Sequence, residues 1–123
     1  MAAVRYIVSD VDAAVAFYTT LLDFDLDEQY GSAMAIVRRG DLTLWLAGPP
    51  SSAARPMPDG RTPEPGGWNR LVIEVDDIAS TVERLSGAGA PFRNDIVSGP
   101  GGRQILLEDP AGNPIELFQP AER

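Results

Sequence analysis

The fold is decided near the C-terminus by residues 105–120, which read ILLEDPAGNPIELFQP. Both ends of this segment are apolar and rich in branched side chains, a pattern typical of buried strands. Between them, Pro110 presets its own φ angle and Gly112 adopts positive φ without steric cost. The sequence therefore predicts a strand, a tight turn and a second strand. Glu116 lies in the middle of the second strand, where a carboxylate among apolar residues requires a partner.

The composition of the whole chain excludes several classes of protein. Its 123 residues suit a single domain with a hydrophobic core. The net charge of −8 argues against a nucleic-acid partner, because an acidic surface repels phosphate groups. No apolar run reaches the roughly 20 residues of a membrane span, and the N-terminus does not resemble a signal peptide. We therefore expect a cytoplasmic protein with no membrane partner.

Three chemically important residue types are absent, since the chain contains no His, no Cys and no Lys. Without Cys there is no disulfide and no thiolate nucleophile. Without His the chain lacks the commonest general base and the commonest metal ligand. Without Lys there is no side chain for Schiff-base chemistry. Any catalysis must use Asp, Glu, Tyr, Ser, Thr, Arg or a bound cofactor.

The rest of the chain alternates between strand and helix patterns. Apolar residues at helical spacing predict a helix at about 12–22, capped by Asp10 or Asp12, and a second helix that begins after Asp76–Asp77. Short strands are predicted at 4–8, 24–29, 33–38, 42–47, 70–75 and 92–97. Within 42–47 the leucines alternate with other residues, so Trp45 is predicted on the face opposite the leucines.

The segment 48–67 has a different composition. It contains six prolines, at 49, 50, 56, 58, 63 and 65, and four glycines, at 48, 60, 66 and 67. Such a sequence predicts neither helix nor sheet. A loop of this length inside a small domain indicates a lid, a binding loop or an arm around a second subunit. The simpler interpretation is a linker between two halves, and the two interpretations are compatible.

The two halves of the chain repeat each other. When the second half is aligned with the first, Val8 falls on Val75, Asp10 on Asp77, Val11 on Ile78, and Val15 on Val82. With a slightly larger offset, 44–49 falls on 115–120. Each half reads strand, helix, strand, strand, strand, and such a repeated unit predicts two similar sheets. We expect one domain over 1–123, with module one at about 1–48, a connecting loop at about 48–68 and module two at about 69–120.

Two segments resemble a known family. Residues 10–18, DVDAAVAFY, are similar to the first helix entry of the glyoxalase, bleomycin-resistance and extradiol-dioxygenase superfamily, also called the vicinal oxygen chelate superfamily. Residues 109–117, DPAGNPIEL, resemble its C-terminal signature. The resemblance covers nearly the whole chain. It implies an α+β fold in which two tandem βαβββ modules form a cup of curved mixed sheet.

The resemblance also implies where a metal ion would bind. In the metalloenzymes of the family the ligands come from the first and last strands of each module. The corresponding positions here are Ala3, Trp45, Arg70 and Glu116. Only Glu116 can be a ligand, because alanine has no donor atom, indole only donates hydrogen bonds, and guanidinium is permanently cationic. One carboxylate does not hold a divalent ion tightly, so we predict no metal and no cofactor.

Arg70 suggests another role for Glu116. We expect an ion pair between them, in which the guanidinium takes the place of the metal charge. Arg5, two residues after Ala3 on the same strand face, is a candidate second cation. Such a pair could orient a polar or anionic ligand. Equally, it could be a structural remnant of a lost metal site, and the sequence favours neither interpretation.

The two tryptophans are the remaining candidates for a binding site. Trp45 is predicted to face the cup together with Glu116, and Trp68 follows the Pro/Gly-rich loop. Indole rings beside a cavity stack on flat or apolar ligands. The alternative is that either ring fills space or lies at a subunit contact. The predicted ligand-binding residues are therefore Arg5, Trp45, Trp68, Arg70 and Glu116.

Two functions follow from these residues and the resemblance. The first is metal-free binding of a small organic molecule, with aromatic compounds among the candidates, as in the drug-sequestering branch of the family. The alternative is a lyase, isomerase or dioxygenase acting on a small carbonyl or oxygenated compound, with Glu116 as metal ligand or catalytic general base. A third possibility is an accessory domain with a vestigial pocket. We also expect a homodimer, because exposed sheet edges favour pairing.

Overall fold

The computed structural model describes residues 1–122, which form two compact units. The first unit contains Met1–Gly66 together with the short segment Pro110–Asn113. The second contains Gly67–Asp109 and the chain from Pro114 onward. Each unit has one four-stranded mixed sheet and one α-helix, so the predicted α+β class with two βαβββ modules is confirmed.

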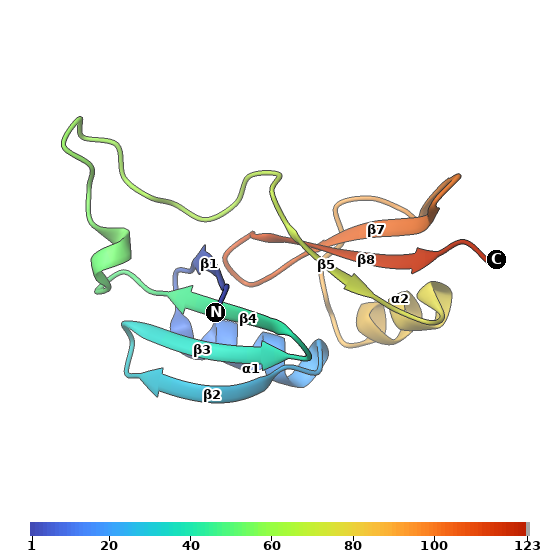
Figure 1. Ribbon diagram of the computed structural model, residues 1–123, viewed down its shortest axis with the longest axis horizontal. Coiled ribbons are helices and arrows are strands. Elements are labelled where there is room, and N and C mark those ends of the chain that lie inside the picture. The colour runs from blue at the N-terminus through green and yellow to red at the C-terminus, as the bar shows by residue number, and fades with distance from the viewer. Residues whose placement is uncertain (123) are drawn as a thin grey trace. The chain divides into compact units, whose positions relative to one another are not determined.

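The first sheet has the strand order β1-β4-β3-β2 (Figure 1). β1 pairs with β4 in parallel, and the other neighbours are antiparallel. The elements are β1 (Val4–Ile7), α1 (Val11–Leu21), β2 (Asp25–Tyr30), β3 (Met34–Arg39) and β4 (Leu42–Ala47). The predicted boundaries of these elements differ from the observed ones by no more than one residue, and those of β4 agree fully.

The helix α1 forms because its first turn is capped and one of its faces is buried. The side chain of Asp10 accepts a hydrogen bond from the backbone N–H of Ala13 at 3.1 Å, so Asp10 is the N-cap. α1 packs against β2, β3 and β4. Its buried Tyr18 makes edge-to-face contacts with Phe17 and Phe24, with ring centroids 5.2 and 5.3 Å apart. These contacts are part of the core of the first unit, which also includes the buried Val37, Leu44 and Leu46.

The Pro/Gly-rich loop is mostly irregular, as its composition predicts. One detail of the prediction was wrong, since Ser52–Ala54 form a short 3₁₀ helix (η1). This single turn lies between prolines, where three consecutive residues without proline are enough for a 3₁₀ turn. The loop as far as Gly66 belongs to the first compact unit.

The second sheet has the strand order β5-β8-β7-β6. Its elements are β5 (Leu71–Glu74), α2 (Ile78–Gly87), β6 (Val97–Gly99), β7 (Gly102–Glu108) and β8 (Pro114–Pro120). Asp77 caps α2 by accepting from the N–H of Ser80 at 3.2 Å. The predicted strand at 92–97 was misplaced. Phe92 forms only an isolated bridge with Leu107, and β6 begins at Val97.

The closing segment folds as its sequence predicts. β7 and β8 pair antiparallel, with Leu106 opposite Glu116, and Gly112 in the turn has a φ of +89°. The turn ends at the buried Asn113, whose Nδ2 donates to the carbonyl of Ile7 at 2.8 Å. Its Oδ1 accepts from the N–H of Gly66 at 2.8 Å. This turn is thus part of the first compact unit.

The sequence repeat is also a repeat of strand register. In the first sheet Val4 lies opposite Leu44, and in the second Leu71 lies opposite Ile115. These pairs correspond to each other when the two halves of the sequence are aligned. Trp45 and Glu116 therefore occupy equivalent positions on the equivalent strands β4 and β8. No helix among residues 1–122 is both long and apolar enough to cross a membrane.

Candidate functional site

The second sheet has one buried, apolar face and an opposite face that is partly open. Alternation along the strands places Ile115 and Leu117 on the buried face, next to Leu71, Ile73 and Leu107. The opposite face, here called the open face, contains Val72, Leu106, Glu116 and Phe118 at paired positions. Val72 and Leu106 flank Glu116 on its two neighbouring strands, which explains why the carboxylate is largely buried.

Arg70 and Glu116 form the predicted ion pair. Arg70 donates from Nε at 3.0 Å and from Nη2 at 2.8 Å, and both bonds go to Oε1 of Glu116. Arg70 thereby leaves the second carboxylate oxygen, Oε2, to other donors. The Glu116 side chain is 10% exposed and that of Arg70 is 29% exposed. Glu116 is thus a nearly buried carboxylate, and its cationic partner Arg70 is more exposed to water.

Trp68 lies beside this pair. Nη1 of Arg70 donates to the backbone carbonyl of Trp68 at 3.3 Å, so one guanidinium contacts both Trp68 and Glu116. The indole ring is one of the most exposed apolar groups of the described chain, with 70% of the residue accessible. Arg70, Glu116 and Trp68, all predicted from the sequence, are therefore close together in the second unit.

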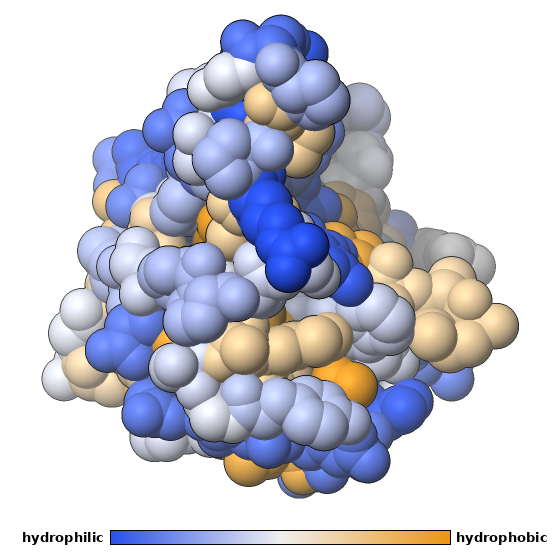
Figure 2. Space-filling model, turned by 90° about the vertical axis from the view of Figure 1, so that its left-hand side faces the viewer, coloured by the Kyte–Doolittle hydropathy of each residue, from blue (hydrophilic) through white to orange (hydrophobic). Residues whose placement is uncertain are grey.

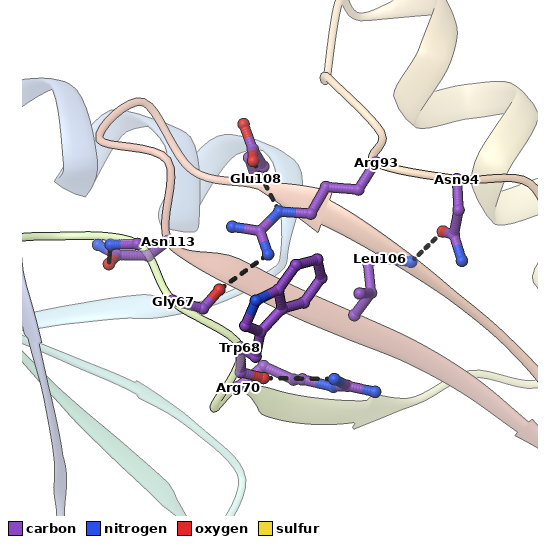
Figure 3. Close-up of polar contacts among 9 residues, drawn as sticks. Gly67, Trp68, Arg70, Arg93, Asn94, Leu106, Glu108 and Asn113 are labelled. Atoms are coloured by element: carbon purple, nitrogen blue, oxygen red, sulfur yellow. Dashed lines mark hydrogen bonds and ion pairs between the residues drawn. The ribbon is translucent and has the colours of Figure 1, made fainter.

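Arg93 is a residue of this cluster that the sequence did not reveal. Its guanidinium carbon lies 4.8 Å from the centroid of the Trp68 ring (Figure 3). Its Nε pairs with Oε2 of Glu108 at 2.7 Å, and its Nη1 donates to the carbonyl of Gly67 at 2.8 Å. The only available signal was alternation, because an arginine next to Phe92 on a strand-like segment faces away from the core.

The other two predicted residues meet in the first unit. Arg5 and Trp45 are paired across β1 and β4, and the Arg5 guanidinium carbon lies 5.0 Å from the Trp45 ring centroid. Their shared face also contains Ile36, which is paired with Trp45 from β3. The prediction that Trp45 faces away from the leucines is confirmed, since Leu44 and Leu46 are fully buried on the other side.

Tyr30 and Glu28 form a polar pair at the edge of the first sheet. The phenol O–H of Tyr30 donates to a carboxylate oxygen of Glu28. This hydrogen bond is the main reason why the pKa of Tyr30 is raised above 10.0, and the negative charge of Glu28 adds to it. The phenol therefore stays protonated, as a hydrogen-bond donor, to higher pH than an ordinary tyrosine.

The residues at the family's metal positions do not fit a metal ion. Glu116 is the only carboxylate among the four positions, and Oε1 already accepts two hydrogen bonds from the permanently cationic Arg70. Trp45 has no lone pair with which to bind a metal ion, and its ring is covered by the Arg5 guanidinium. Across residues 1–122, no three His, Cys, Asp or Glu side chains gather into a metal-binding group.

The first unit also contains a small cavity of about 270 Å³ under the Pro/Gly-rich loop. The end of β1 and the loop both line it, including Ile7, Val8, Ala54, Pro63 and Pro65. Figure 2 views the molecule from the loop side, where hydrophilic residues predominate and apolar residues appear in small patches between them. None of the predicted site residues lines this cavity.

Comparison with protein families identifies the fold. The sequence model of the glyoxalase/bleomycin resistance protein/dioxygenase superfamily matches residues 1–117. The chain belongs to this superfamily. The resemblance stated from residues 10–18 and 109–117 is thus confirmed over almost the whole chain. No curated protein matches the chain.

Solved structures of the superfamily have the same fold. A lactoylglutathione lyase from Agrobacterium tumefaciens is 22% identical, with a TM-score of 0.74 over 97% of this chain and 92% of that one. The fosfomycin resistance protein FosX from Listeria monocytogenes is 14% identical, with a TM-score of 0.74 over 98% and 93%. TnmS3, an antibiotic-binding protein from Streptomyces sp. CB03234, is 27% identical, with a TM-score of 0.69 over 98% and 97%.

Proposed function

We propose that this superfamily member binds a small organic molecule without a metal ion, and that Arg70 and Glu116 contact it. The observation that carries the proposal is the pair of hydrogen bonds from Arg70 to Oε1 of Glu116. A fixed cation next to the carboxylate supplies the charge that a metal would supply elsewhere. The remaining oxygen, Oε2, is an acceptor for a hydrogen-bond donor on the ligand.

Each unit also offers an aromatic surface for binding. Trp68 lies next to Arg70 in the second unit, and Trp45 lies next to Arg5 in the first. An arginine next to an indole offers a flat surface and a positive charge together, which suits an aromatic compound with polar substituents. TnmS3, at 27% identity, is an antibiotic-binding protein, and this likeness supports binding rather than turnover.

The enzymatic alternative is less well supported. As a metal ligand or a general base, Glu116 would have to act through Oε2 alone, since Arg70 donates twice to Oε1, and the permanent charge of Arg70 repels a metal ion. The likeness to lactoylglutathione lyase, at 22% identity, extends only to the fold. We further propose that the protein is a homodimer, and its cytoplasmic location stays a prediction from the sequence.

Binding can be tested by calorimetric titration of the chelator-treated protein against a panel of aromatic antibiotics and other small aromatic compounds. We expect at least one compound to bind at micromolar concentration. Glu116→Gln and Arg70→Met should each weaken that binding about tenfold or more, since each removes a charged hydrogen-bonding group. The control is Arg61→Met, which removes an exposed arginine that pairs with Asp59 in the loop.

Two results would contradict the proposal. One is binding that appears only after a divalent ion is restored, with the ion bound in stoichiometric amount. The other is equal affinity of the wild type and both variants for every compound that binds, which would make the Arg70–Glu116 pair purely structural.

A further inference from the structure

We infer that Trp68 is a pre-positioned stacking platform for a planar aromatic ligand, and that Arg93 is the residue that positions it. The inference rests on the proposed function and specifies the class of ligand. Trp68 is 70% exposed, yet its ring contacts one arginine and its backbone carbonyl accepts a hydrogen bond from another.

The segment that contains Arg93 is itself fixed to β7. The backbone N–H of Arg93 donates to the carbonyl of Leu106 at 2.9 Å, and the N–H of Glu108 donates to the carbonyl of Pro91 at 2.9 Å. The side chain of Asn94 accepts from the N–H of Leu106 at 2.9 Å. These bonds lie on both sides of Arg93 and hold its backbone against β7.

The guanidinium of Arg93 is fixed as well. Glu108 pairs with Nε at 2.7 Å and the carbonyl of Gly67 accepts from Nη1 at 2.8 Å, so the plane of the group is defined by two partners in different directions. The side chain is only 18% exposed. The Arg93 guanidinium carbon lies over the Trp68 ring, 4.8 Å from its centroid, in the geometry of a cation–π contact (Figure 3).

One ring face of Trp68 is therefore covered by Arg93, while the high exposure of the residue leaves the other face to solvent. Ordering an exposed indole on binding would cost conformational entropy, and a ring that is already held avoids much of that cost. The backbone of the same residue is held by Arg70 through the 3.3 Å bond to its carbonyl. A tryptophan with arginine contacts at both its backbone and its ring is suited to stacking.

The surrounding charges define the ligand further. Arg93 is paired with Glu108 and Arg70 with Glu116, so neither cation is available as the main partner of a carboxylate or phosphate. Arg70 leaves Oε2 of Glu116 to other donors, next to the residue that holds Trp68. The ligand that fits is a planar aromatic compound with a hydroxyl or amino group that donates a hydrogen bond to this oxygen.

Three matched probes test the ligand class. They are 2-naphthol, which has both the plane and the donor, 2-methoxynaphthalene, which lacks the donor, and decahydro-2-naphthol, which lacks the plane. In a Trp45→Phe background Trp68 is the single tryptophan, and the shift of its indole N–H signal in NMR reports binding. We expect naphthol to bind tightest and the saturated alcohol about tenfold or more weaker, because stacking is lost.

The positioning role of Arg93 is tested in the same background without any ligand, by time-resolved fluorescence anisotropy of Trp68. We expect Arg93→Met to add a fast motion of the indole and to weaken naphthol binding about three- to tenfold. Arg93→Lys retains the charge opposite Glu108 but not the planar fork, and should give an intermediate result if the methionine variant folds poorly. Arg61→Met is the control and should change neither measurement.

The outcomes separate the inference from the proposed function. Unchanged anisotropy in folded Arg93→Met and Arg93→Lys overturns the positioning role, whatever binds. Equal affinity for naphthol and its saturated analogue overturns the stacking platform, although other compounds can still bind at Glu116. Failure of every compound to bind the wild type overturns the proposed function, whereas the anisotropy measurement still decides what Arg93 does.

Discussion

At the scale of single residues, the Arg70–Glu116 pair is asymmetric. Glu116 is the more buried partner, with 10% of its side chain exposed against 29% for Arg70. Removal of the arginine therefore leaves a carboxylate that water reaches poorly, whereas removal of the carboxylate leaves a guanidinium that can turn outward. The pair orients charge in the proposed site, and its contribution to stability depends on which partner is lost.

This asymmetry gives a testable order of stabilities. We expect Arg70→Met to lower the free energy of unfolding by about 2–4 kcal/mol and Glu116→Gln by about 1–2 kcal/mol. The double replacement by methionine should lie within about 1 kcal/mol of the wild type, because no unpaired charge remains. Urea denaturation of the four proteins measures all three values. A Glu116 variant less stable than the Arg70 variant would show that the carboxylate has another essential partner.

Tyr30 gives a prediction about pH. Its pKa is raised above 10.0, first because its O–H donates to Glu28 and then because Glu28 is negatively charged. The protonated phenol is therefore favoured in the folded chain. Its stabilising hydrogen bond is fully present below the pKa of an ordinary tyrosine and is lost as the pH rises through the folded pKa.

The titration of Tyr30 can be isolated by ultraviolet absorbance of tyrosinate, as the difference between the wild type and Tyr30→Phe. We expect a midpoint above 10.0, the pKa of an ordinary tyrosine, and Glu28→Gln should move it down toward that value. A midpoint at or below that of an ordinary tyrosine in the wild type would mean that the hydrogen bond to Glu28 does not form in solution.

At the scale of elements, Asn113 shows how the turn between β7 and β8 is fixed. Its amide donates to the carbonyl of Ile7 and accepts from the N–H of Gly66, so both ends of the side chain are used. Asn94 is a useful contrast, since its side-chain oxygen accepts from the N–H of Leu106. Aspartate can replace an acceptor but not a donor.

We therefore expect Asn113→Asp to cost about 2–4 kcal/mol of unfolding free energy, because a buried carboxylate would face the carbonyl of Ile7. Asn94→Asp should change the stability by less than about 0.5 kcal/mol, since the acceptor is retained. Thermal denaturation of both variants gives the comparison. Equal stability of the two would show that the Asn113 donor makes no contribution.

The sequence predicted most elements because local signals are strong where both caps and periodicity agree. α1 begins after Asp10 and β4 covers 42–47, and turn chemistry at Gly112 places β7 and β8. Segment 92–97 was misplaced because its backbone pairs with β7 through one bridge and a few separate hydrogen bonds, which leave no alternating pattern. Local sequence patterns predict regular strand pairing but do not predict such edge contacts.

The site was only partly predictable for a similar reason. The ion pair followed from the resemblance, which placed Arg70 and Glu116 at two of the family's metal-ligand positions, on the first and last strands of module two. Arg93 meets Glu108 and Gly67, which are 15 and 26 residues away in sequence, and no motif connects the three. A role that depends on the fold bringing distant residues together is visible only once the register of the strands is known.

At the scale of the whole molecule, the repeat has kept the backbone and changed the site. β4 and β8 have the same register with their parallel partners, yet Trp45 stands in one and Glu116 in the other. Each has an arginine partner, but from a different position, because Arg5 is paired directly with Trp45 whereas Arg70 lies two residues before Val72, the residue paired with Glu116. Close packing limits which side chains fit the buried faces of the two sheets, whereas the opposite faces can carry different residues.

The exposed apolar residues of both units lead to a prediction about assembly. Both units expose apolar side chains, among them Leu26 and Tyr30 in the first and Trp68, Val72 and Val97 in the second. Covering part of this surface with a second copy would bury apolar area and protect short edge strands.

We expect sedimentation velocity to give twice the mass of one chain at micromolar concentration. If unfolding and dissociation are coupled, the melting temperature should rise by roughly 2–5 °C for each tenfold increase in protein concentration, because both chains melt together. A single-chain mass with a melting temperature independent of concentration would instead establish a monomer.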